Sequence, residues 1–419
     1  MSATGVAQGT APATRPRLAL AATMAVQAMA TVAMTAPSVL APVVAPLLGV
    51  PPQRVGWFVG LAYFAAMFSG LVVGPHIARL GAIRLSRAAL LAGATGLSLA
   101  ALGATSAAWL VMLALAAIAI GTGYGVPNPA ASMVLATHAP PARRGLYFSI
   151  KQTGVPIGVG LAGLTVPALI AVMPWTWALW VLALACVALA AALGPAGVLE
   201  RRVPGTRVAA ASTGAALRSP LGAALAPLGR VWREPALRRL GVASLAFSMT
   251  QLCFVTFLVS TLKLEHGLTL AAAAGVLSIS QVLSVGCRVL WGQVADRWVQ
   301  PLRLLAVLGL TMAGSATLLG LLPTDAPRWT LMAAALACAA TSMAWNGVYF
   351  AELAHRVRAE ELGEVTGATQ FLTFCGAMAG PVGFASLVGV TGSHGATYVV
   401  MAAAPLAVGV WLWVASGED

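Results

Sequence analysis

Two basic side chains lie deep in apolar stretches of this sequence, where a charge is costly to bury. Lys151 follows Arg144 by seven residues, about 10 Å along a helix, and Arg288 precedes Asp296 by eight, about 12 Å. The first acidic residue of the chain is Glu200, so Lys151 has no carboxylate partner in the first 199 residues. An unpaired charge in a low-dielectric environment needs a counter-ion. We therefore predict that Lys151 and Arg288 neutralise a small organic or inorganic anion; the alternative is that each side chain snorkels toward the polar edge.

Uncharged polar and aromatic side chains recur at helical spacing within the same apolar stretches. Gln27 and Thr31 are four residues apart, as are Trp345 and Tyr349, so each pair shares one face of a helix. Polar side chains in such a setting tend to face a cavity, although Ser and Thr also bond to their own helix backbone. Together with Lys151 and Arg288, the residues that we predict to contact a bound solute are Gln27, Thr31, Asn128, Gln152, Gln251, Gln281, Trp345, Asn346, Tyr349 and Gln370.

The sequence lacks the spacings of known catalytic and metal-binding motifs. It contains no GxSxG, HExxH or Walker loop, and its five cysteines lie in apolar stretches without a CxxC pair. We therefore expect no enzyme activity, no catalytic residue, no metal site and no cofactor. A membrane-embedded enzyme would need clustered His or Asp within its spans, and a receptor would be expected to carry a signalling domain.

The composition is that of a protein whose surface faces lipid. Hydrophobic residues make up 59% of the 419 residues and charged residues only 8%, against about 25% charged residues in a soluble domain. The net charge is +13, but the basic residues lie in short gaps between apolar stretches and form no aromatic-interleaved basic face. The composition therefore favours the lipid bilayer as a partner and argues against nucleic acid.

The lengths of the uncharged stretches predict the number of membrane spans. A helix needs roughly 20 apolar residues to cross the hydrocarbon core, and six stretches of 21 to 36 residues hold one span each. Three stretches of 48 to 55 residues must fold back once, at turns near 104–108, 173–174 and 391–395. Backbone groups in lipid have no other hydrogen-bond partners, so each span is helical. The sequence predicts an all-α membrane protein of twelve transmembrane helices.

The distribution of Lys and Arg predicts the orientation in the membrane. With the N-terminus inside, the cytoplasmic segments carry nineteen Arg, whereas the outer loops carry only Arg54, Lys263 and Arg328. Both termini are therefore expected in the cytoplasm, with the protein in a cell (inner) membrane. The 22 Arg against two Lys, with abundant Ala and Gly, favour a bacterial source. Segment 200–239 is predicted as a cytoplasmic linker between an N-terminal bundle at 1–199 and a C-terminal bundle at 240–419.

The two halves of the chain match at a constant offset of 218 residues. Gly74 aligns with Gly292 at this offset, and Asn128 aligns with Asn346. The paired positions lie near predicted cytoplasmic ends, so both halves have the same orientation. This pattern indicates two six-helix bundles related by a pseudo-twofold axis along the membrane normal.

The loops after the second and eighth spans carry a motif that resembles the signature of the major facilitator superfamily, G-x-x-x-D-R-x-G-x-R. The first copy has Ala78 where the signature has Asp; it keeps Gly74, Arg79 and Gly81 and continues to Arg84. The second copy keeps Gly292, Asp296 and Arg297. The resemblance implies the twelve-helix fold of this family, and a loop that latches the two halves in the outward-facing state.

That family contains secondary transporters that move small solutes by alternating access, so the resemblance implies this activity. We predict that the solute is an anion, with efflux of drug-like or amphipathic compounds as the alternative. Glu352 and Glu364 are the two carboxylates near a span; they either carry a coupling proton or pair with Arg356 or Arg358, and we favour pairing. We expect a monomer. The predicted coupling or gating residues are Gly74, Arg79, Gly81, Arg84, Gly292, Asp296, Arg297, Glu352 and Glu364.

Overall fold

A computed structural model describes residues 15–103, 106, 108–140, 144–200, 228–357 and 362–417. Within these ranges the side chains of residues 75, 78, 144–146, 149, 296, 354, 362–364 and 367 are not described. The predicted gating side chains of Asp296 and Glu364 therefore lie outside the described part, as does Arg358. The regular secondary structure in the described ranges is helical, without a strand.

Twelve segments of the described chain are long and apolar enough to cross a membrane, which confirms the predicted number. The first six spans are α1 (Pro16–Leu47), α2 (Val55–Leu80), α3 (Ala82–Gly103), α4 with α5 (Trp109–Gly125, Pro127–His138), α6 with α7 (Arg144–Gln152, Gly154–Ile170) and α8 (Trp175–Ala192). The last six are α10 (Pro235–Leu264), α11 (Leu270–Arg297), α12 (Pro301–Leu321), α13 with α14 (Arg328–Ser342, Trp345–Arg356), α15 (Leu362–Thr391) and α16 with α17 (His394–Met401, Ala403–Ala415). Two short 3-10 helices, η1 (Pro52–Arg54) and η3 (Pro195–Glu200), precede α2 and follow α8.

The three long apolar stretches fold back where the sequence predicts. The chain turns between α3 and α4, between α7 and α8, and between α15 and α16, within or beside the predicted turn segments. Helix α10, the first span of the second bundle, begins at Pro235, and proline is well suited to the first turn of a helix. Helix α10 therefore starts inside the segment that we predicted as a linker, of which 201–227 lies outside the described residues.

Breaks inside the spans are not predicted by the hydropathy pattern. Helix α4 gives way to α5 at Val126, directly before Pro127, which has no N–H to continue the helical ladder. The corresponding break in the second half separates α13 from α14 at 343–344. The bounds of α5 (127–138) and α14 (345–356) differ by 218 residues, and so do the first residues of α6 (144) and α15 (362). The internal repeat is therefore present in the backbone.

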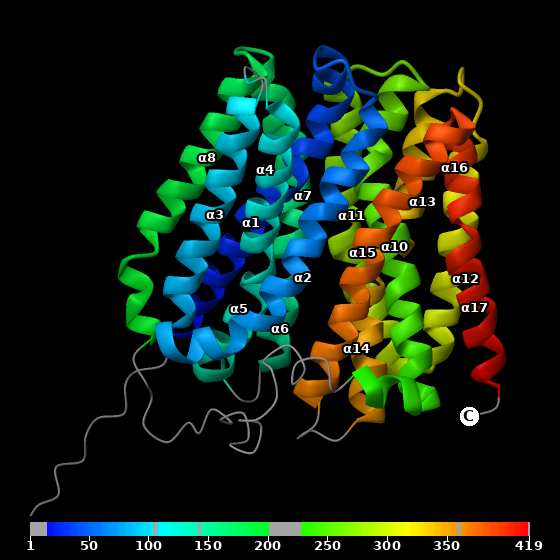
Figure 1. Ribbon diagram of the computed structural model, residues 1–419. Helices are drawn as coiled ribbons and strands as arrows, with labels where there is room; N and C mark the ends of the chain where they lie inside the picture. The colour runs from blue at the N-terminus through cyan, green and yellow to red at the C-terminus, as the bar shows by residue number, and fades with distance from the viewer. Residues whose placement is uncertain are drawn as a thin grey trace, which may run out of the picture.

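The two halves form two bundles, with α1–α8 on the left and α10–α17 on the right of Figure 1. Helix α1 begins and α17 ends at the lower end in this view, which we call the termini end; the opposite end is the distal end. Toward the distal end one hydrophobic core joins the bundles, and it includes Val39 and Val59 together with Phe257 and Phe384. At the termini end one core contains only residues between 19 and 199, and another only residues between 228 and 412. The bundles are thus packed together at the distal end and have separate cores at the termini end.

Glycines allow the closest contacts between the bundles. A Cβ added at Gly56 of α2 would lie 2.2 Å from the carbonyl oxygen of Pro381 and 2.9 Å from the ring of Phe257. A Cβ at Gly163 of α7 would lie 2.4 Å from the hydroxyl of Ser278 on α11. Small residues let helix backbones approach in a membrane, where dispersion contacts rather than the hydrophobic effect hold helices together.

Candidate functional site

A hydrogen-bonded cluster around Lys151 lies inside the first bundle. Lys151 is near the end of α6 and is only 2% exposed, and its Nζ lies 3.0 Å from Oε1 of Gln27 on α1. The same Nζ donates to Oδ1 of Asn128 in the first turn of α5. The ammonium thus bonds to amide oxygens of two other helices and does not snorkel toward the polar edge. Both partners are neutral, so they orient the ammonium without balancing its charge.

Close packing of α7 on α1 places Lys151 beside Gln27. The fifth span is interrupted at Thr153, whose hydroxyl donates to the carbonyl oxygen of Ile150 at 2.6 Å. Gly154 then begins α7 so close to α1 that a Cβ would come within 3.0 Å of the Gln27 side chain. Because this glycine lets the backbones approach, the ammonium of the preceding helix reaches the Gln27 amide.

Arg288 lies at the break in the tenth span. It is half-buried on α11, and its Nε donates to the carbonyl oxygen of Met343 at 2.9 Å. The end of a helix leaves carbonyl groups without intrahelical donors, and Arg288 binds one of these between α13 and α14. The counterpart of Arg288 at the 218-residue offset is Gly70, and that of Lys151 is Thr369. The two cations therefore occupy non-equivalent positions of the repeat, so the duplicated fold alone does not require them.

Trp345 is the largest fully buried side chain of the second bundle. Its Nε1 donates to Oε1 of Gln251 on α10 at 2.9 Å. Its ring packs edge-on between Phe247 and Tyr349, with centroid distances of 5.7 and 5.5 Å. The hydroxyl of Tyr349 is buried and has no hydrogen-bond partner among the described residues. These contacts bring together Gln251, Trp345 and Tyr349, three of the predicted solute contacts.

Aromatic side chains connect the two bundles near the cations. Tyr124 of α4 lies within electrostatic range of Arg288 on α11. Its ring packs edge-on against Tyr63 of α2, with centroids 5.6 Å apart, and Tyr63 lies 6.0 Å from the ring of Phe374 on α15. The sequence prediction missed Tyr63, Tyr124 and Phe374. The sequence marks these three residues only as aromatic side chains within the second, fourth and eleventh spans, and this alone does not predict that they contact one another.

The remaining predicted solute contacts have different surroundings. Thr31 is buried, and its hydroxyl donates to the carbonyl oxygen of Gln27 in its own helix at 2.8 Å. Gln281 is buried next to Gly160, where α11 meets α7 of the other bundle, and its Oε1 has no partner within the described part of the chain. Gln281 therefore belongs to the contact between bundles. The other three, Gln152, Asn346 and Gln370, are half-buried.

The loop between α2 and α3 is held by a carboxylate of the same bundle. Gly81 has a φ of +97°, and a Cβ there would collide with the carboxylate of Glu200. Oε1 of Glu200 accepts from the backbone N–H of Arg84 at 2.8 Å, and Oε2 lies 3.5 Å from Nε of the same arginine. Glu200 thus holds the segment Gly81–Arg84, which follows Ala78, the position where the family signature has Asp. Of the other predicted gating residues, Gly74, Arg79 and Arg297 are exposed and Gly292 is half-buried.

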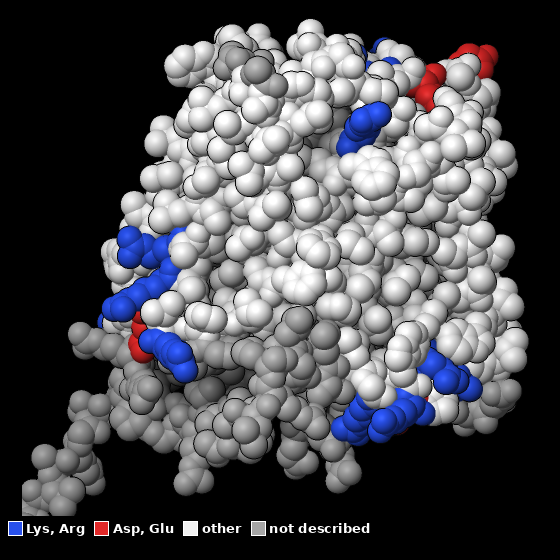
Figure 2. All heavy atoms as spheres, in the orientation of Figure 1, with Lys and Arg blue, Asp and Glu red and all other residues white. Residues whose placement is uncertain are grey.

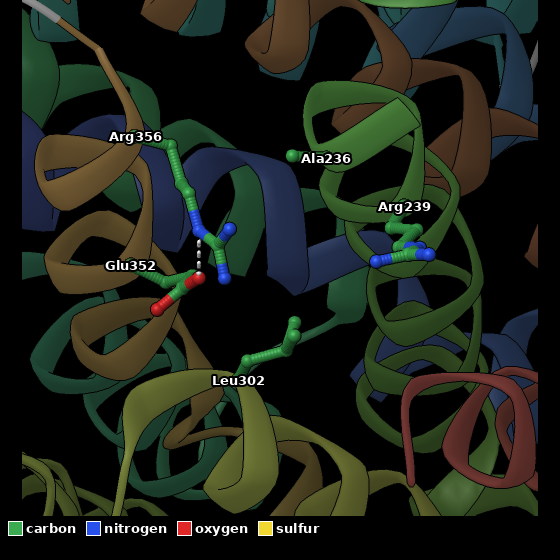
Figure 3. A pocket seen from close by; sticks show the side chains of 5 residues that line it. All are labelled: Ala236, Arg239, Leu302, Glu352 and Arg356. Atoms are coloured by element: carbon green, nitrogen blue, oxygen red, sulfur yellow. Dashed lines mark hydrogen bonds and ion pairs between the residues drawn. The ribbon is translucent and has the colours of Figure 1, made fainter. Parts of the chain in front are cut away.

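Glu352 forms an ion pair at the termini end of the second bundle. Its Oε1 accepts from Nε of Arg356 at 2.8 Å, so the favoured pairing is present. Figure 3 shows the pair on one side of a small pocket and Arg239 on the other, with Ala236 and Leu302 completing the lining. The hollow of about 160 Å³ includes open solvent and has no enclosed space for even a water molecule. This pocket is therefore too small to be the solute site.

A carboxylate at the distal end caps the last span. Glu265 follows α10, and its two oxygens accept from the backbone N–H groups of His394 at 2.5 Å and Gly395 at 3.1 Å. These are amides of the first turn of α16, which have no partner within their own helix. Burial raises the pKa of the Glu265 carboxyl, but the side chain of His394, 3.5 Å away, and the backbone N–H groups of His394 and Gly395 outweigh this and lower it to about 2.

The site offers cations, amides and aromatic rings rather than a metal-binding cluster. Within the described ranges, no group of three or more His, Cys, Asp or Glu is placed to hold a metal ion. Lys151 and Arg288 come from different bundles, and each is bound by neutral oxygen atoms. Cationic groups held in this way can bind an anionic ligand.

Most of this chain matches a known protein family by sequence. A sequence model described as Major Facilitator Superfamily matches residues 23–381. Two curated proteins from strains of Mycobacterium tuberculosis, each named an uncharacterized MFS-type transporter, are 26% identical to this chain over 288 residues. The match covers 68% of this chain and 61% of each relative, so it spans less than two thirds of their length.

Solved structures share the fold over nearly the whole chain. A bacterial homolog of the human lysosomal transporter Spinster, in an inward-facing and unoccupied conformation, has a TM-score of 0.67 at 16% identity, with 96% of this chain and 95% of that chain covered. A peptide transporter POT has a TM-score of 0.69 at 17% identity, with 95% and 94% covered. At these identities the similarity establishes the fold, and it confirms the predicted pair of six-helix bundles.

Proposed function

This chain belongs to the Major Facilitator Superfamily, and from this premise we propose that it is a secondary active transporter of a small organic or inorganic anion, working by alternating access. The family supports transport across a membrane in general, by a multi-pass protein that is not an enzyme. The identity of the solute rests on the electrostatics of the site.

The observation that carries the proposal is the pairing of Lys151 with neutral partners only. Its Nζ bonds to Gln27 and Asn128, whose amide oxygens carry no net charge. The carboxylate that the structure describes in the first bundle is that of Glu200, which is bound to the loop before Arg84. Leaving a buried cation unneutralised costs several kcal/mol, so an anionic solute between the bundles stabilises the occupied state.

Arg288 supplies the second charge from the opposite bundle. Its Nε is bound to Met343, and the planar guanidinium has further N–H donors in the geometry that carboxylates and phosphates accept. An anion that reaches both Lys151 and Arg288 connects the two bundles electrostatically. Solute binding in the centre is then coupled to the relative movement of the bundles, as alternating access requires.

The proposed orientation places the termini end in the cytoplasm of a bacterial cell, with the protein in its inner membrane. The excess of Arg in the loops of this end supports the orientation. The bundles share a core at the distal end and have separate cores at the termini end. This arrangement of cores supports a state that is closed toward the outside, in which the solute exchanges with the cytoplasm.

Flux into proteoliposomes tests the proposal. Purified protein is screened against a panel of carboxylates, phosphate and sulfate by thermal shift, and the anions that stabilise it are measured in flux with and without a pH gradient. Loss of one partner of a buried charge pair costs at least about 2 kcal/mol, so Lys151→Gln and Arg288→Gln should each weaken transport roughly 30-fold. Arg328→Gln removes the same charge from an exposed distal loop and should transport normally. Full anion transport by either site variant would contradict the proposal.

Efflux of drug-like or amphipathic compounds is the second candidate, and the aromatic contacts favour it. Tyr63, Tyr124 and Phe374 form a connected set of rings between the bundles, and such rings bind apolar and planar ligands. The two functions differ in charge selectivity. Transport of neutral or cationic dyes that is insensitive to Lys151→Gln would favour efflux, whereas competition by small anions would favour the anion site.

A coupling proton remains part of the proposal, as does a monomeric transporter. Glu352 is paired with Arg356, so a proton reaches this carboxylate only if the pair opens. A pH gradient that drives flux in wild-type protein and in Glu352→Gln alike would show that Glu352 does not carry the proton.

A further inference from the structure

We propose that the outer surface formed by α3 and α8, at the termini end, binds the phosphate of an anionic phospholipid through Arg84 and Arg87. We call Arg84, Arg87 and the end of α8 at Ala190 the α3–α8 site. The inference concerns the surface of the first bundle and does not depend on which solute is transported. It needs only the membrane embedding that the fold establishes.

Arg87 is exposed but fixed in position by the end of α8. Its Nε donates to the carbonyl oxygen of Ala190 at 2.8 Å. The N–H of Gly194, four residues later, bonds to Ala191 instead, so Ala190 offers its carbonyl oxygen to the arginine. A cation near a helix C-terminus is also favoured by the helix dipole. The guanidinium is therefore held in place between α3 and α8, and its terminal nitrogens carry further N–H donors for a ligand.

Arg84 lies one turn before Arg87 on the same helix, so the two side chains are neighbours on one face of α3. The side chain of Arg84 is 75% exposed. Glu200 accepts from its backbone N–H at 2.8 Å and approaches its Nε at 3.5 Å, while the carboxylate itself is only 16% exposed. Glu200 carries one negative charge, whereas Arg84 and Arg87 carry two positive charges. The α3–α8 site therefore keeps a net positive charge.

The surface above the two arginines is apolar and faces outward. Leu91 and Leu102 of α3 and Leu184 and Val187 of α8 are exposed large hydrophobic side chains. Arg87 is the sixth residue of α3, and its guanidinium is bound at the last turn of α8. It therefore lies near the ends of both helices, within reach of a lipid headgroup. A phosphate at the arginines thus lets acyl chains run along α3 and α8. A free phosphate ion would leave this apolar surface uncovered, and we therefore assign the site to a lipid.

Several basic side chains at the termini end of the second bundle already have partners. Figure 2 shows basic side chains gathered on both flanks of this end, and those on the left flank lie over the region of α3 and α8. On the second bundle, Arg230 pairs with Glu234 and Arg356 with Glu352, and Arg303 lies over the ring of Trp413. The α3–α8 site is therefore expected to bind anionic lipid more tightly than the general excess of Arg does.

Native mass spectrometry of the purified protein, titrated with short-chain phosphatidylglycerol or phosphatidylcholine, tests the site. Wild-type protein should retain phosphatidylglycerol in preference to phosphatidylcholine. Arg84→Gln/Arg87→Gln should weaken phosphatidylglycerol binding roughly tenfold or more, since each basic side chain near a membrane surface contributes about a factor of five. The matched control Arg233→Gln/Arg238→Gln removes the same charge from exposed positions of the second bundle and should bind as wild type does.

Two results would overturn the inference. Equal loss of phosphatidylglycerol in the control pair would show that net charge alone attracts the lipid, and equal binding of phosphatidylcholine would show that the headgroup charge is not recognised. If the double variant fails to fold, Arg84→Gln alone keeps the backbone contact with Glu200 and should still weaken binding about fivefold. Unchanged binding by this folded single variant would also overturn the inference.

Discussion

The Nζ of Lys151 lies 3.0 Å from Oε1 of Gln27, so a cation at the end of α6 is oriented by an amide of α1 rather than by a carboxylate. Replacing that amide by a carboxylate, Gln27→Glu, supplies the missing counter-ion at nearly the same volume. We expect the folded protein to survive and anion transport to fall roughly 30-fold or more, because Lys151 is then neutralised from within. Transport assays in proteoliposomes measure the loss. The control Gln300→Glu makes the same chemical change at an exposed position, and similar losses in both variants would refute the role assigned to Lys151.

The hydrogen bond from Trp345 to Gln251 is expected to stabilise the second bundle. Trp345→Phe removes the Nε1 donor but keeps an aromatic ring against Phe247 and Tyr349. A buried acceptor left without its donor costs about 1–3 kcal/mol, so the thermal midpoint in detergent should fall by several degrees. Trp298→Phe, at a position that is 74% exposed, serves as the control. An unchanged midpoint for Trp345→Phe would mean that the Gln251 amide finds another donor.

Gly56 is expected to be necessary for closure of the distal end. A Cβ at this position would lie 2.2 Å from the Pro381 carbonyl oxygen, closer than any real contact allows. Gly56→Val should therefore separate the bundles at this end and shift the protein toward an outward-open state. Spin-label distances between Ala136 on α5 and His355 on α14, in a background without native cysteines, should shorten as the termini ends approach each other. The control Gly275→Ala places its Cβ in open space, and a distance shift of the same size there would contradict this mechanism.

The cap that Glu265 provides on α16 should make stability depend on pH. Burial raises the pKa of the Glu265 carboxyl, but the interactions with His394 and Gly395 are stronger and lower it to about 2. A carboxyl whose folded pKa is depressed contributes stability above its unfolded pKa of about 4.5 and loses that contribution as pH falls toward about 2. The difference in thermal midpoint between wild type and Glu265→Gln should thus be full near pH 7 and shrink below about pH 4.5.

Glu234→Gln is the control for this pH profile, since Glu234 is paired with Arg230 in a half-exposed i,i+4 contact. Such pairs contribute little to stability, and its profile should follow that of wild type. A difference between wild type and Glu265→Gln that stays constant down to about pH 2 would show that the carboxylate charge is not what holds α16.

The arrangement of the spans could be predicted because it depends on local composition. The stretches of 48 to 55 uncharged residues are too long for one crossing, and the chain folds back between α3 and α4, α7 and α8, and α15 and α16 as predicted. The repeat was visible because duplicated loops keep Gly74 and Gly292 in register. The bilayer acts as a solvent on every residue, so these features need no knowledge of which helices touch.

The partners of the polar side chains could not be predicted in this way. Lys151 was recognised as unpaired, but its bonds to Gln27 and Asn128 depend on the break at Thr153 and the close approach of Gly154 to α1. Arg288 binds Met343 only because the tenth span is interrupted there. The rings of Tyr63, Tyr124 and Phe374 come from three separate spans, and no spacing in the sequence relates them.

The twelve crossings and the two like-oriented bundles follow from the residues of each stretch alone, because span length and hydropathy are set by the thickness and polarity of lipid. Contacts between helices are needed to establish that the bundles meet at the distal end, that Glu200 holds the loop beside Gly81, and that Lys151 bonds to Gln27. Those contacts depend on the rotation of each helix about its axis and on how closely two backbones approach. Both are fixed by packing between residues far apart in the chain, so the order of residues within one span does not reveal them.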